Sequence, residues 1–198
     1  RDALKNLGLS IGGITMSSTV IGLLQSCSGK SNLSWNPEIF DSQEAELITK
    51  TLEVILPKTE DIPGATELNL TQFIDGYIKH VSGSEEQKSI KKLAEKYLST
   101  TKATLGKKNV SDMTLDDIDS RLAYYLKADK SQIDQWSNED SDDASNYNFL
   151  NSLRSRGVSA FKMSEYIGEK VLAYSPIPGQ QIGCVDLNEA TGGKAWSI

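Results

Sequence analysis

The chain has 198 residues, a formal net charge of −6 and two cysteines. This length predicts one main globular domain that is large enough to bury a sizeable core. The acidic balance argues against a protein that binds nucleic acid by neutralising phosphates.

The first 26 residues have the pattern of an export signal. Residues 1–5 read Arg-Asp-Ala-Leu-Lys, which is similar to a twin-arginine motif with Arg1 as the second arginine. The weakly apolar residues 7–24 are diluted with glycine, serine and threonine, which is typical of a signal sequence rather than of a stable spanning helix. Two alternatives remain open: a buried helix of the domain, and an uncleaved membrane anchor.

Residues 24–27 read Leu-Gln-Ser-Cys, which is typical of a lipoprotein cleavage box. We therefore expect residues 1–26 to form a signal peptide, Cys27 to carry a lipid, and residues 27–34 to tether the folded domain at residues 35–198. This predicts a periplasmic protein that the lipid on Cys27 anchors to a bacterial membrane. The positions that carry the signal are Arg1, Leu4, Lys5, Leu24 and Ser26.

The domain is expected to open with an amphipathic helix. Asp41 or Ser42 can cap its N-terminus, with Glu44 in the first turn, and Pro57 ends it. After a turn, a second helix is predicted over residues 70–81. Its apolar side chains are expected on one face: Phe73, Ile74, Tyr77, Ile78 and Val81.

Two more helices follow with clear start signals. Residues 84–87 read Ser-Glu-Glu-Gln, a capping box for a third helix. Its apolar stripe over residues 90–98 has the i, i+3, i+4, i+7 spacing of a helix that packs on a core, and Gly106 ends it. Thr114 can cap a fourth helix over residues 115–126.

The later part of the chain is less regular. Residues 127–146 are polar and acidic, interrupted only by Ile133 and Trp136. A fifth helix is expected to end at Gly157, and a sixth helix to run over residues 159–173. The prolines and glycines beyond residue 174 predict an irregular arm. The predicted fold class is therefore all-α, a bundle of about five to six helices with an irregular Pro/Gly-rich C-terminal arm.

Motifs that would bind a cofactor or a metal ion are missing from this sequence. The single histidine, His80, has no ligand partners at workable spacing, and no haem-attachment or dinucleotide-binding motif occurs. The acidic residues 139–143 lack the alternation of a calcium loop and predict a solvated loop. Cys184 is predicted to be either a buried thiol or a contact to a partner subunit.

Several stretches of the domain together carry a family pattern. Residues 35–40 read Trp-Asn-Pro-Glu-Ile-Phe, residues 53–59 read Glu-Val-Ile-Leu-Pro-Lys-Thr, and residues 62–65 read Ile-Pro-Gly-Ala. Near the end, residues 174–179 read Tyr-Ser-Pro-Ile-Pro-Gly and residues 194–196 read Lys-Ala-Trp. With these stretches the chain resembles the gluconate 2-dehydrogenase subunit 3 family.

The resemblance implies a small, non-catalytic subunit of a membrane-associated dehydrogenase, and it supplies no catalytic, cofactor-binding or metal-binding residues. The implied partner is a flavoprotein large subunit of the glucose–methanol–choline oxidoreductase type, which carries FAD. A cytochrome c subunit with haem c often completes such a complex. The large subunit commonly lacks a signal and is exported with the small one. The apparent lipid box departs from the family pattern and suggests a tethered variant.

We therefore expect an accessory subunit that binds, escorts through export and tethers a flavin-dependent sugar or sugar-acid dehydrogenase. Aromatic side chains often dominate the energetics of such interfaces. The candidate partner-binding residues are Trp35, Trp136, Tyr174, Pro178, Cys184 and Trp196. Each tryptophan could instead pack within the chain's own fold. The alternative function is a stand-alone periplasmic lipoprotein that binds a small ligand or a cell-wall component.

Overall fold

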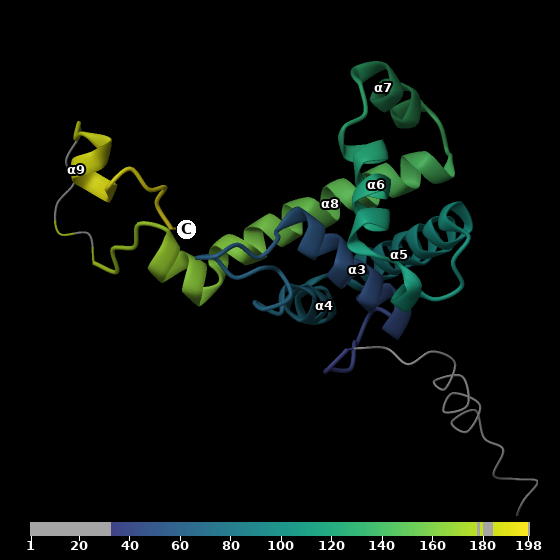
Figure 1. Ribbon diagram of the computed structural model, residues 1–198, viewed down its shortest axis with the longest axis horizontal. Coiled ribbons are helices and arrows are strands. Elements are labelled where there is room, and N and C mark those ends of the chain that lie inside the picture. The colour runs from purple at the N-terminus through teal and green to yellow at the C-terminus, as the bar shows by residue number, and fades with distance from the viewer. Residues whose placement is uncertain (1–32, 178, 180–183, 198) are drawn as a thin grey trace, which may run out of the picture. The chain divides into compact units, whose positions relative to one another are not determined.

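Helices make up nearly all the regular structure in the computed structural model, which describes residues 33–177, 179 and 184–197 (Figure 1). The long helices are α3 (Ser42–Ile55), α4 (Leu70–Val81), α5 (Ser84–Leu105), α6 (Leu115–Leu126), α7 (Lys130–Asn138) and α8 (Asp142–Met163). The short elements are the 3-10 turn η1 (Val110–Asp112), the π-helical turn η2 (Ile167–Val171) and α9 (Leu187–Thr191). The all-α prediction is confirmed.

The core forms around α3 and α8. These helices contact each other, both contact α4, α5 and α6, and α8 also contacts α7. The α3 stripe of Ala45, Leu47, Ile48 and Leu52 is fully buried. As the apolar spacing predicts, Ala94 and Tyr97 of α5 and the facing residues of α6 pack against it. No helix in the described ranges is long and apolar enough to cross a membrane.

The predicted caps of α3 and α6 are confirmed. The Asp41 carboxylate accepts the N–H groups of Gln43 and Glu44, each at 2.8 Å, and Glu44 accepts the Asp41 N–H at 2.8 Å. Thr114 and Asp117 form the same reciprocal box at α6. Both caps depend on residues three positions apart, and such local geometry can be read from the sequence.

The predicted capping box of α5 is wrong. Gly83 is the N-cap, and no side chain caps this helix. The Gln87 amide instead donates to carbonyls at and just after the end of α4: Ile78 at 3.1 Å, Lys79 at 2.9 Å and Ser82 at 2.8 Å. Because only Ser82 and Gly83 connect the two helices, Gln87 lies against these carbonyls and satisfies them.

The predicted helix end at Gly157 is also wrong, and so is the sixth helix over residues 159–173. Helix α8 continues through Gly157 to Met163, and only the π-helical turn η2 follows. A Cβ on Gly157 would lie 2.6 Å from Leu52 Cδ2, so this glycine lets α8 approach α3 closely. Gly157 therefore allows close helix packing and does not end the helix.

Two further expectations are corrected between α6 and α8 and within α4. The polar residues 127–146 contain α7, capped by Asp129, which accepts the Gln132 N–H at 2.9 Å.

The apolar residues of α4 do not share one buried face. Its core stripe is Leu70, Ile74 and Ile78. Its second stripe is exposed to solvent: Phe73, Tyr77 and Val81. The two stripes are rotated by about 100° on an α-helix, so only one of them reaches the core.

Candidate partner-binding surface

Glu53 organises the loop between α3 and α4. Its carboxylate accepts the N–H groups of Lys58 at 3.3 Å and of Thr66 at 2.8 Å. A Cβ on Gly64 would lie 2.7 Å from the Lys58 backbone nitrogen, so only glycine fits there. The sequence pattern over residues 53–65 is therefore explained by the packing of this loop.

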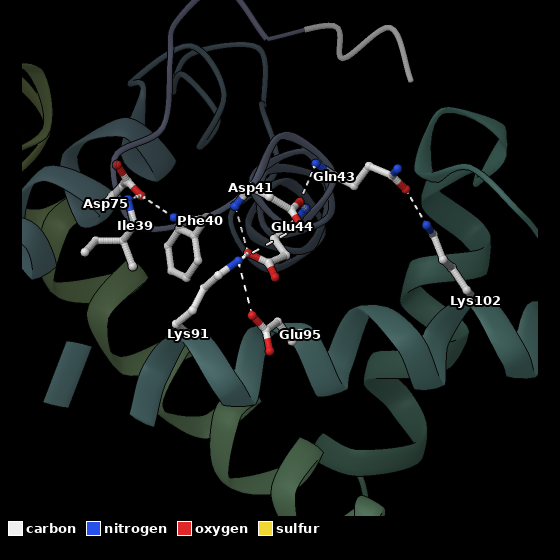
Figure 2. A network of polar contacts seen from close by, with 9 residues as sticks. All are labelled: Ile39, Phe40, Asp41, Gln43, Glu44, Asp75, Lys91, Glu95 and Lys102. Atoms are coloured by element: carbon white, nitrogen blue, oxygen red, sulfur yellow. Dashed lines mark hydrogen bonds and ion pairs between the residues drawn. The ribbon is translucent and has the colours of Figure 1, made fainter. Parts of the chain in front are cut away.

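Asp75 fixes the segment that leads into α3 (Figure 2). Its side chain lies in α4 and the residue is 1% exposed. The carboxylate accepts three backbone N–H groups, from Glu38 at 2.7 Å and from Ile39 and Phe40 at 3.1 Å each. A buried carboxylate is tolerated when it is hydrogen-bonded in this way. The sequence pattern over residues 35–40 thus also has a structural role.

Glu44 joins the start of α3 to α5 (Figure 2). Its buried carboxylate pairs with Lys91 Nζ at 2.5 Å. Burial raises the pKa of Glu44, while the hydrogen bonds from Lys91 and from the Asp41 N–H act in the opposite direction. On the same side, Lys102 donates to the side-chain oxygen of Gln43. These contacts make the network part of the scaffold, and it holds α3, α4 and α5 in a fixed arrangement.

A groove with a volume of about 260 Å³ lies between α4 and α8. Its α4 side is formed by Phe73 and Tyr77, whose ring centroids are 6.2 Å apart and which are 48% and 44% exposed. On α8, the exposed Met163 extends the apolar surface, and Ser155 and Ser159 contribute only small side chains. The groove is therefore shallow, mostly apolar and open to solvent.

Arg156 is the charged residue that lines this groove. Its guanidinium donates to Glu86 Oε1 at 2.6 Å, and this hydrogen bond lowers the pKa of Glu86. From residue 151 to residue 163 the sequence contains three cationic residues and no acidic one. This end of α8 is thus basic in a chain whose formal net charge is −6.

The second apolar surface is the C-terminal arm, which we define as residues 174–197. Its ends are joined by main-chain hydrogen bonds, from the Ala173 N–H to the Ala195 carbonyl at 2.8 Å and from the Ser197 N–H to the Ala173 carbonyl at 2.9 Å. Helix α9 buries none of its residues. Among the described residues of the arm, the exposed large apolar ones are Tyr174, Ile177, Val185, Leu187 and Trp196.

The predicted partner-binding residues fall into different environments. Trp136 is 6% exposed and packs its ring 5.4 Å from that of Tyr147, which favours the intramolecular alternative. Trp35 is half-buried against the core. Tyr174 and Trp196 are exposed on the arm. Cys184 is exposed as well, so the predicted buried thiol is wrong, because this part of the arm does not pack on the core. Outside the described residues lie Pro178, Arg1, Leu4, Lys5, Leu24, Ser26 and Cys27.

Sequence reasoning missed the groove. A signal for it was present, because α4 carries two parallel apolar stripes and a helix at the edge of a core buries only one. The second stripe identifies a surface, but its neighbour α8 is known only from the fold. In the described ranges, no His, Cys, Asp and Glu side chains gather in a way that could hold a metal ion.

Comparison with protein families gives one match. The family model described as Gluconate 2-dehydrogenase subunit 3 matches residues 42–179, from the first residue of α3 into the arm. The match includes the Glu53 loop, Asp75 and both sides of the groove. Comparisons with curated proteins and with solved structures gave no match.

Proposed function

Because the chain belongs to the gluconate 2-dehydrogenase subunit 3 family, we propose that it is the accessory subunit of a flavin-dependent sugar or sugar-acid dehydrogenase. In this proposal it is not catalytic. It binds a flavoprotein of the glucose–methanol–choline type, accompanies it through twin-arginine export and tethers it by the lipid on Cys27. FAD belongs to the partner, and haem c to a third, cytochrome subunit where one is present.

The exposed arm is the observation that carries the proposal. Ile177 is 84% exposed and Trp196 is 55% exposed, although both are large apolar side chains. Both belong to the arm, whose short helix α9 buries none of its residues. Five exposed large apolar residues on one short segment are characteristic of a protein interaction site. A subunit that works by holding another protein needs such a surface.

The scaffold contacts support the non-catalytic part of the proposal. Asp75 and Glu44, two deeply buried carboxylates, are both engaged in holding helices together. A general acid or base must instead reach a substrate in an accessible site. The alternative of a stand-alone ligand-binding lipoprotein has less support, because a groove of about 260 Å³ is below the usual size of small-molecule sites.

Export provides the test. A flavoprotein subunit from the same genome that lacks its own signal would be expressed with and without this chain, and its amount in the periplasmic and membrane fractions measured. We expect it there only when this chain is present. A variant with Arg1→Lys and Lys5→Gln tests the leader. Equal export of the flavoprotein in the absence of this chain would contradict the escort role.

A further inference from the structure

We infer that the groove between α4 and α8 binds an amphipathic helix of the flavoprotein subunit, a helix whose apolar ridge is flanked by carboxylates. The inference rests on the proposed function, since it names where and how the partner is held. It concerns a surface separate from the arm, on other elements of the fold. Shape, charge and rigidity each support this choice of occupant.

The shape of the groove suits a helix. Phe73 and Tyr77 lie one turn apart on α4, and Ser155 and Ser159 lie one turn apart on α8. Large aromatic side chains thus border the α4 side, and on α8 the small Ser155 and Ser159 leave room for another backbone beside Arg156 and Met163. A ridge of apolar residues at i and i+4 fits between such rows, as in other complexes where a helix binds in a groove. A flat membrane surface would leave this concave volume unfilled.

The charge of the groove selects an acidic partner. Arg156 uses one nitrogen for Glu86, and a guanidinium has five N–H donors, so it can bind a further carboxylate. Arg156 is thus the cationic group at the groove, and the acidic residue of α4, Asp75, is buried and fully engaged. A carboxylate beside the partner's apolar ridge would be attracted to the remaining donors of this guanidinium.

The groove is also preorganised. Each lining helix also has a side in the core: Ile78 of α4 and Leu153 of α8 are buried and do not line the groove. Asp75 fixes α4, and Gly157 sets the close contact of α8 with α3. Because the walls do not need to be ordered on binding, little of the interaction energy is lost.

The experiment tests the groove by placing a bulky side chain in it. Ser159→Trp adds bulk at an exposed lining position, and Val158→Trp adds the same bulk at the neighbouring exposed position that does not line the groove. The dissociation constant of the full chain for the purified flavoprotein subunit is measured for both and for Phe73→Ala. Thermal unfolding verifies that each variant is folded. We expect Ser159→Trp and Phe73→Ala to weaken binding by on the order of tenfold or more, and Val158→Trp to leave it unchanged.

The remaining outcomes are distinct. If the wild-type chain does not bind the flavoprotein, the proposed function itself fails. If it binds and Ser159→Trp binds equally well, the function stands and the groove inference is overturned. Vesicles of anionic phospholipid serve as a second probe. If the wild-type chain binds them, and Ser159→Trp loses vesicle binding while retaining the flavoprotein, the groove faces a membrane and the inference is also wrong.

Discussion

Gly157 offers the sharpest test of the fold. Replacing it with alanine adds one methyl group, and this group would lie 2.6 Å from Leu52 Cδ2 and 3.9 Å from Leu56 Cδ1. Leu52 is fully buried near the C-terminal end of α3, so its side chain would have to shift within the core to accept this methyl group. Gly76 provides the matched control. It also lies inside a helix, α4, and a Cβ there would meet nothing within 4 Å.

Two opposing effects set the change in the free energy of unfolding that each glycine-to-alanine substitution causes. Alanine is favoured over glycine inside a helix by about 1 kcal/mol. Overpacking a filled core costs about 1–3 kcal/mol. Gly76→Ala should therefore raise the free energy of unfolding by about 1 kcal/mol, since only the first effect applies. Gly157→Ala should lower it by about 1 kcal/mol, so the two variants should differ by about 2 kcal/mol.

Urea unfolding followed by circular dichroism measures both values. A third comparison isolates the contact: in a Leu52→Ala background the opposing methyl groups are gone, and Gly157→Ala should become stabilising. The reasoning would be refuted if Gly157→Ala stabilised the wild-type chain as much as Gly76→Ala does. In that case Gly157 would not be the point where α8 meets α3.

Three further predictions follow from the described contacts and from the leader. Gly64→Ala should lower the free energy of unfolding by about 2 kcal/mol or more, because the clashing atom is the Lys58 backbone nitrogen; thermal unfolding measures this, and an unchanged melting temperature would contradict it. The pKa of Asp117 is lowered from 3.8 to about 2, chiefly by its hydrogen bond from Lys107. A lowered carboxyl pKa gives stability that is present above pH 3.8 and lost as the pH falls toward 2, so Asp117→Asn should flatten the loss of stability in this range; an identical acid profile would exclude the pair as a contributor. Cys27→Ala should remove the protein from the membrane fraction, and unchanged size and membrane association would argue against the lipid.

The elements that the sequence predicted well depend on neighbouring residues. The capping pairs of α3 and α6 and the stop at Gly106 involve contacts within a few positions, and Gly106 has the left-handed φ of 64° that favours glycine. The errors involve residues that act over longer distances. Gly157 reads as a helix stop, but its role is set by Leu52, far away in the chain.

The same distinction between local and long-range contacts applies to the candidate partner-binding surfaces. The exposed apolar arm could be predicted, because prolines and glycines prevent the residues around Tyr174 and Trp196 from joining a helical core. The groove could not be predicted, because it needs α4 and α8 side by side, and nothing local brings Phe73 close to Ser159. The burial of Trp136 likewise depends on three tyrosines from α6 and α8.

The central claim is that this chain acts by holding a flavoprotein and performs no redox chemistry itself. The most direct measurement is size-exclusion chromatography with light scattering on the two co-expressed subunits, followed by separation and assay of each for flavin and dehydrogenase activity. We predict one complex of defined stoichiometry, with flavin and activity found only in the partner after separation. Separate elution of the two proteins, or flavin and activity in this chain alone, would contradict the account.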